Sequence, residues 1–220
     1  MVDRVHHYCS ASVFLSLVKN KELWLTSLAQ SNDNQEGTWM LSYWLDLFNR
    51  HRGDPKKLLE GKGAKFVVEN ILRHNVALGT CFSEDRDLLS QWRGYAGDGT
   101  GFSVTFDKEG LAALAADFEG KTALSLSKIS YGLKDLQKVN SVVKDLYEAF
   151  GSDAKRYEEG QDGIGSISLD FTPEKTKKQR AAARKLFTIK NAAFAEEKEW
   201  RLFVFDSIRD INNVEFRESR

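Results

Sequence analysis

Two hydrophobic periods alternate along the chain, which predicts a protein built from both strands and helices. A period of two residues, typical of a strand with one buried face, is clearest in Phe102–Phe106. Apolar residues at helical spacing recur elsewhere, and the helix after residue 10 has Ser10 or Ser12 as its cap. The predicted strands are 4–8, 23–25, 76–82, 102–106, 124–131, 200–206 and 214–216. The predicted helices are 13–18, 39–48, 64–74, a short helix after 83–87, 136–150 and 174–186.

The order of these elements predicts the fold class. Helices and strands are interspersed without a strict strand–helix–strand rhythm, which favours an α+β protein over a doubly wound sheet. We find neither an internal repeat nor a convincing linker, so residues 1–220 are expected to form a single domain. A polar, glycine-rich loop at 151–172 is expected to lie within a helical and loop insertion at about 132–187.

Composition excludes several classes of protein. Hydrophobic residues make up 41% of the chain, enough for a core, and 32 basic residues balance 32 acidic ones. This balance gives no global field that would attract nucleic acid or a membrane. With only Cys9 and Cys81, a disulfide framework or zinc site is not expected, and a reducing cytoplasm fits best. No apolar signal region or membrane-spanning run occurs, so a cytoplasmic protein without membrane contact is expected.

The common catalytic and nucleotide-binding motifs are missing from the sequence. There is no P-loop, dinucleotide fingerprint, zinc-protease motif or nucleophile elbow. The glycine-rich stretch Gly97–Gly101 precedes a strand instead of a helix, so it lacks a phosphate-binding helix N-terminus and is predicted to be a turn. The four histidines are scattered, and no metal is expected.

A motif near the N-terminus suggests a nucleotide site. His7-Tyr8-Cys9-Ser10 ends a predicted strand, and an amphipathic helix and a leucine-led strand follow it. This pattern resembles the first motif of the ADP-ribosyltransferase superfamily, although Tyr8 stands where that superfamily has glycine and Ser10 comes one residue late. The resemblance implies that His7, with Tyr8 and Ser10, binds NAD through the adenosine ribose. The alternative is a histidine at a strand end that is satisfied by backbone atoms.

A second motif lies near the C-terminus. Glu197-Lys198-Glu199-Trp200-Arg201 opens an apolar strand, and in an extended segment Glu197 and Glu199 would point to the same side. The motif resembles the Glu-x-Glu version of the superfamily's third motif, which implies that Glu199 and Glu197 are catalytic. The alternative is an acidic run that is simply solvated.

The middle motif is the least specific of the three. The superfamily often places a serine and an aromatic residue after its second strand, where they flank the nicotinamide ring. The resemblance therefore implies that Ser90, Trp92 and Tyr95 bind NAD, whereas Trp92 is also a natural core residue.

Four short motifs together also resemble an uncharacterised bacterial family. The family has H-Y-x-S near the start, then N-D-x-x-E, Q-W-x-x-Y and E-x-E-W-R. The matching segments are His7–Ser10, Asn32–Glu36, Gln91–Tyr95 and Glu197–Arg201. This resemblance spans nearly the whole chain and implies no activity.

The ADP-ribosyltransferase resemblance implies a fold and a reaction. The fold would be a split mixed sheet with flanking helices, in which His7 and Glu199 face each other across an NAD cleft. NAD, as substrate, loses nicotinamide as a neutral amine, so no general acid is required. Glu199 would stabilise the cationic transition state, and Glu197 would position or deprotonate a macromolecular acceptor, either protein or nucleic acid. By family analogy the protein would be a toxin or a phage-defence effector.

Other functions remain open from the sequence. An NAD glycohydrolase would use the same site with water as the acceptor. A nucleic-acid- or protein-binding module would instead use the basic segment Lys175–Lys185 as an exposed surface. A metal-dependent nuclease would need Asp33, Glu36 and Glu199 as a cluster, while the simpler function for Asn32–Glu36 is a turn and helix cap.

Overall fold

The fold was obtained as a computed structural model. It describes residues 3–30, 37–40, 62–118, 124–132, 141–142, 144–146, 148–150, 152–153 and 173–207. The predictions at 32–36, 41–48, 154–172 and 214–216 lie outside these residues.

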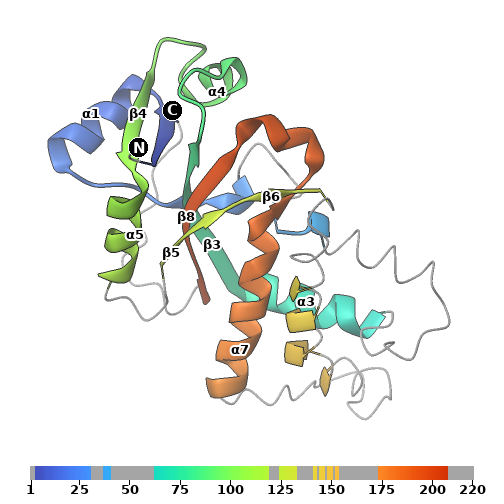
Figure 1. Cartoon of the computed structure of the whole chain (residues 1–220). Helices are drawn as coiled ribbons and strands as arrows, with labels where there is room; N and C mark the ends of the chain where they lie inside the picture. The colour runs from blue at the N-terminus through green and yellow to red at the C-terminus, as the bar shows by residue number, and fades with distance from the viewer. Residues whose placement is uncertain are drawn as a thin grey trace.

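The centre of the fold is an antiparallel sheet in the order β4-β1-β3-β8-β5, with β2 paired to β3 (Figure 1). Its strands are β1 (Arg4–Cys9), β2 (Thr26–Ser27), β3 (Asn75–Ser83), β4 (Phe102–Asp107), β5 (Ser125–Lys128) and β8 (Glu199–Ser207). A second, two-stranded sheet pairs β6 (Ser130–Tyr131) with β7 (Ile189–Lys190) in parallel. The α+β class is therefore confirmed, and parallel pairing in the described residues is confined to β6 and β7.

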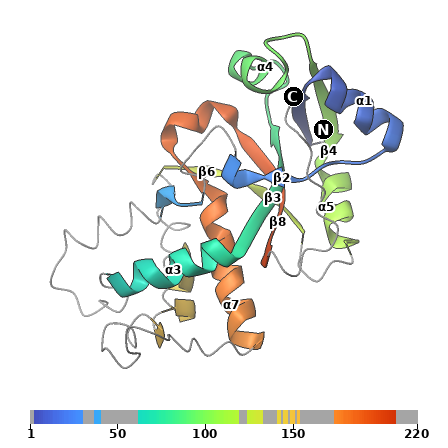
Figure 2. The ribbon, with the colours of Figure 1, turned by 180° about the vertical axis from the view of Figure 1, so that it is seen from behind.

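The helices lie around this sheet (Figures 1 and 2). They are α1 (Ala11–Asn20), α3 (Lys62–His74), α4 (Leu89–Tyr95), α5 (Lys108–Ala116) and α7 (Pro173–Arg184), with the 3₁₀ turns η1 (Leu28–Gln30), η2 (Lys185–Thr188) and η3 (Ala192–Glu197). In both views α1 and α4 lie at one end of the sheet, and α3 and α7 lie at the other. Segment 132–187, predicted as an insertion, supplies α7 and η2 to the main core.

Most predicted boundaries agree with the structure to within a few residues. Ser10 caps α1 by accepting a hydrogen bond from the backbone N–H of Val13. The strand predicted at 23–25 is displaced to β2, and the one predicted at 124–131 is divided between the two sheets. Helix α5 was not predicted; Asp107 caps it by accepting from the backbone N–H of Glu109.

Strand β8 is buried on both faces, because a hydrophobic cluster covers each. Phe203 and Phe205 pack with residues of α3, α7 and η2. Leu202 and Val204 pack on the other face with residues of β1, β3 and α5, among them Val5. Burying each such side chain contributes about 1.5–3 kcal/mol to stability. β8 is thus the strand around which the domain is organised, and the Glu-x-Glu motif leads directly into it.

No helix in the part of the chain that the structure describes is long and apolar enough to cross a membrane.

Candidate functional site

The strands that carry the first and third motifs, β1 and β8, both pair with β3, and the middle motif lies on α4. β3 lies between β1 and β8, and Ser83, at the end of β3, is directly opposite both His6 and Glu199. Directly opposite residues in antiparallel strands point to the same face. His6, Ser83 and Glu199 therefore share one face at the end of the sheet where β8 begins.

His7 points to the opposite face, because successive residues of a strand alternate. Its ring centroid lies 5.7 Å from that of Phe82, a member of the cluster containing Leu202 and Val204. His7 Nδ1 is 2.9 Å from the carbonyl oxygen of Cys81, and burial lowers the pKa of the ring. The expectation that His7 and Glu199 face each other is therefore wrong. The alternative, a histidine whose ring is hydrogen-bonded to backbone atoms, agrees with the contact between His7 and the Cys81 carbonyl.

Glu197 and Glu199 meet in a buried ion cluster. Lys190 Nζ lies 2.8 Å from Oε2 of Glu197 and 3.3 Å from Oε2 of Glu199. Arg201 places Nε 2.8 Å and Nη2 2.7 Å from Oε1 of Glu199, and its Nη1 donates to the carbonyl of Phe187. The four charged residues are each at most 9% exposed, so two carboxylates and two cations lie together in the interior.

The two carboxylates come together for a reason that differs from the one predicted. The segment is not extended: Glu197 ends η3, and Lys198 takes a left-handed conformation with φ 45° before β8 begins at Glu199. This kink, and not strand alternation, brings Glu197 back toward Glu199. Both carboxylates contact Lys190, so they do lie on the same side, although the segment is not extended as predicted.

Their surroundings shift the two carboxylates in opposite directions. Burial raises the pKa of Glu197, and the single contact with Lys190 offsets this only in part. Burial also acts to raise the pKa of Glu199, but Arg201 and Lys190 outweigh it and hold that pKa below its usual value. Glu199 thus stays ionised, while Glu197 is the better proton acceptor of the two.

Two tyrosines border this cluster, and both are partly exposed. The hydroxyl oxygen of Tyr131 accepts a 2.7 Å hydrogen bond from the backbone N–H of Glu199. Burial raises the pKa of Tyr95, and the charge of nearby Glu197 raises it further. Tyr95, expected to bind NAD, is therefore close to the carboxylates.

The other expected NAD-binding residues take structural roles in this state. The Tyr8 hydroxyl donates to the carbonyl of Asp85 and accepts from the N–H of Leu88. The Trp92 ring packs edge-on against Tyr8 at 5.1 Å, and its Nε1 donates to Asp87. Ser10 caps α1. Among the described residues, the buried Ser90 hydroxyl has no hydrogen-bond partner.

Sequence reasoning missed Lys190 and Tyr131. Each lies in a two-residue strand with no motif around it, and only the parallel pairing of β6 and β7 brings them to Glu199. Arg201 could be anticipated as an ion-pair partner, because it lies two residues after Glu199 on the same strand face.

The basic segment is not a continuous exposed surface. Four of its six cations contact other parts of the protein, and Lys177 and Lys178 are exposed. The four contacts are Lys175 to Asp153, Arg180 to Asp206, Lys185 to Asp145, and Arg184 over the Phe203 ring. A nucleic-acid surface along α7 is therefore limited to few free cations. Likewise, no three His, Cys, Asp or Glu side chains gather as a metal site in the described ranges, and Asp33 and Glu36 lie outside them.

Comparison with known families adds one finding. A family model described as "Protein of unknown function (DUF2971)" matches residues 91–202, just over half of the chain. The chain belongs to the DUF2971 family. The DUF2971 match runs from α4 into β8 and includes the Q-W-x-x-Y and E-x-E-W-R motifs, which agrees with the expected uncharacterised family. No curated protein and no solved structure matches the chain.

Proposed function

We propose that this protein transfers ADP-ribose from NAD to a macromolecular acceptor, with Glu197 and Glu199 as the reacting carboxylates. The observation that carries the proposal is the pair itself: two buried carboxylates share one lysine, and their pKa values move in opposite directions. Pairs of this kind divide the roles of charge stabilisation and proton transfer in many enzymes. Further support comes from the position of β1 and β8, which carry the first and third motifs, on either side of β3.

The proposed reaction assigns one role to each carboxylate. The bond between the ribose C1′ and the nicotinamide nitrogen breaks, and the electron pair leaves with neutral nicotinamide. Ionised Glu199 stabilises the cationic ribose that develops. The acceptor's nucleophilic atom then bonds to C1′, and its proton passes to Glu197, whose raised pKa suits it to act as the base. Tyr95, whose pKa is raised in part by the charge of Glu197, would contact the nicotinamide ring.

The test is incubation with NAD labelled in the adenylate phosphate, together with a cell extract. Wild type is compared with Glu199→Gln and Glu197→Gln, and with Glu109→Gln as a matched control on the exposed surface of α5. We expect labelled protein or nucleic acid with wild type and Glu109→Gln, and a loss of about 100-fold or more for Glu199→Gln. Circular dichroism and thermal unfolding of each variant separate loss of chemistry from loss of fold.

Three other outcomes would change the conclusion. Free labelled ADP-ribose without a labelled macromolecule would establish a glycohydrolase at the same site. Equal turnover by folded Glu199→Gln would remove the carboxylate pair from the mechanism. No NAD consumption by wild type would reject the proposal and favour a binding module.

A further inference from the structure

Lys190 contacts both carboxylates of the ion cluster. Its ammonium lies 2.8 Å from Glu197 and 3.3 Å from Glu199, and 4.7 Å from the centre of the Phe194 ring. An ammonium carries three protons, and these three groups fix its position from different sides. Arg201, by contrast, binds Glu199 and the Phe187 carbonyl. Lys190 therefore links Glu197 to Glu199 through one ammonium group.

The small parallel sheet fixes Lys190 relative to Glu199. Lys190 is paired with Tyr131, whose hydroxyl accepts from the backbone N–H of Glu199. The N–H of Gly132 also donates to the carbonyl of Lys190 at 2.8 Å. The same two short strands thus hold Glu199 by its backbone through Tyr131 and by its carboxylate through Lys190. This double attachment gives a functional reason for strands of only two residues each.

The positive charge of Lys190 offsets the repulsion between the two buried carboxylates. Without its ammonium, two buried carboxylates would face each other with only Arg201 to compensate, and like charges at short range disfavour double ionisation. The charged or titratable groups that act on the pair from the surrounding elements are Arg201 on β8, Cys81 on β3, Tyr95 on α4 and Tyr131 on β6. Of these, only Arg201 is a cation.

We propose that Lys190 is a positioning residue that holds Glu197 and Glu199 together as an ionised pair. The role of this pair in catalysis rests on the proposed function, whereas the effect of Lys190 on the charges of the two carboxylates does not. Removing the ammonium removes the interaction that lowers the pKa of Glu197, so that pKa rises further. Glu197 would then become a base only at higher pH.

The experiment compares Lys190→Met, Lys190→Gln and Lys190→Arg with wild type. Met and Gln both remove the positive charge, and Gln keeps a hydrogen-bond donor. The test needs only one of these two variants to fold. Arg keeps the charge and is the control. The first readout is the ¹³C NMR titration of glutamate carboxyls in labelled protein, with the Glu197 signal assigned by its loss in Glu197→Gln. The second is the pH dependence of kcat for NAD turnover.

We expect the Glu197 titration to move to higher pH in the uncharged variants and to stay near the wild-type position in Lys190→Arg. The acid limb of kcat should move with it, and kcat at neutral pH should fall about 100-fold, the usual effect of a misplaced catalytic group. An unchanged Glu197 titration, or a lower kcat with the same pH profile, would reduce Lys190 to a packing role and overturn the inference. If wild type does not consume NAD but the titration still moves, the proposed reaction fails and the role of Lys190 in holding the pair stands.

Discussion

His6 and Glu199 lie on the same face of the main sheet, separated by the single strand β3. His6 is buried, and its Nδ1 lies 3.0 Å from the hydroxyl of Thr105. Burial and the nearby charge of Arg86 lower its pKa, which favours the neutral ring. Within the proposed function, the histidine that shares a face with the carboxylates is therefore His6, one residue before the position that the motif indicated.

His7 should make stability depend on pH. The pKa of the His7 ring is lowered in the folded state. As the pH falls below 6.5, the unfolded chain therefore binds a proton at this residue more readily than the folded chain does. The stability that the neutral His7 ring contributes is fully present above pH 6.5 and is lost progressively below it. In His7→Gln, the free energy of unfolding should decrease less than in wild type between about pH 7.5 and pH 5. Urea unfolding across this range measures the difference, and parallel curves for the two proteins would contradict the buried, neutral state of His7.

Gly101 should not tolerate a side chain. A Cβ atom there would lie 2.3 Å from the Cys9 carbonyl oxygen and 2.8 Å from that of Ala96, and neither backbone atom is free to move. Gly101→Ala should therefore lower the free energy of unfolding by about 3 kcal/mol. Gly110→Ala is the matched control: Gly110 lies exposed in α5 and its added Cβ has ample space. This second change should raise stability by about 0.5–1 kcal/mol. Chemical denaturation compares both variants with wild type, and equal effects of the two substitutions would contradict the close approach of Gly101 to β1.

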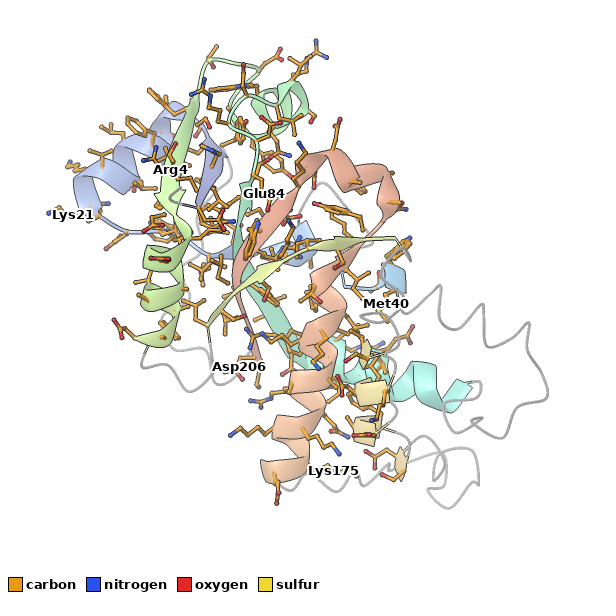
Figure 3. All side chains as sticks on the ribbon, in the orientation of Figure 1. Arg4, Lys21, Met40, Glu84, Lys175 and Asp206 are labelled. Carbon is orange, nitrogen blue, oxygen red and sulfur yellow. The ribbon has the colours of Figure 1, made fainter. Side chains whose placement is uncertain are left out.

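Two cations on α7 should differ sharply in their contribution to stability. Arg180 Nη1 lies 2.6 Å from Oδ1 of Asp206. Asp206 is a buried carboxylate near the end of β8 and is labelled in Figure 3. Arg180→Met leaves that charge without its guanidinium and should cost about 2 kcal/mol. Lys178 is exposed, and Lys178→Met should change stability by less than about 0.5 kcal/mol. Thermal and urea unfolding measure both, and a loss of similar size for the two variants would mean that α7 is held to the sheet in another way.

The sequence was informative where a local pattern decides the structure. The two-residue period predicted β4, the cap at Ser10 predicted the start of α1, and the acidic motif predicted that Glu197 and Glu199 come together. Each of these outcomes depends on residues close together in the chain.

Its failures come from pairing between distant segments. His7 was assigned to the wrong face because a change of one residue in a strand reverses the direction of the side chain. Lys190 and Tyr131 were missed because their strands are too short to show a period, and their roles exist only after β6 and β7 have paired. Helix α5 was missed because an alanine-rich segment with few buried positions gives a weak apolar pattern.

The position of β8 also bears on how the protein is made. β8 follows every other described strand along the chain, yet it lies in the sheet between β3 and β5. A ribosome therefore produces β3 and β5 before β8, and the strand edges that pair with β8 stay unpaired until β8 has been made. The ion cluster also depends on this part of the chain, because Glu197, Glu199 and Arg201 lie at or just before the start of β8. The carboxylate pair therefore assembles only after residues 197–201 have been made and β8 has paired between β3 and β5.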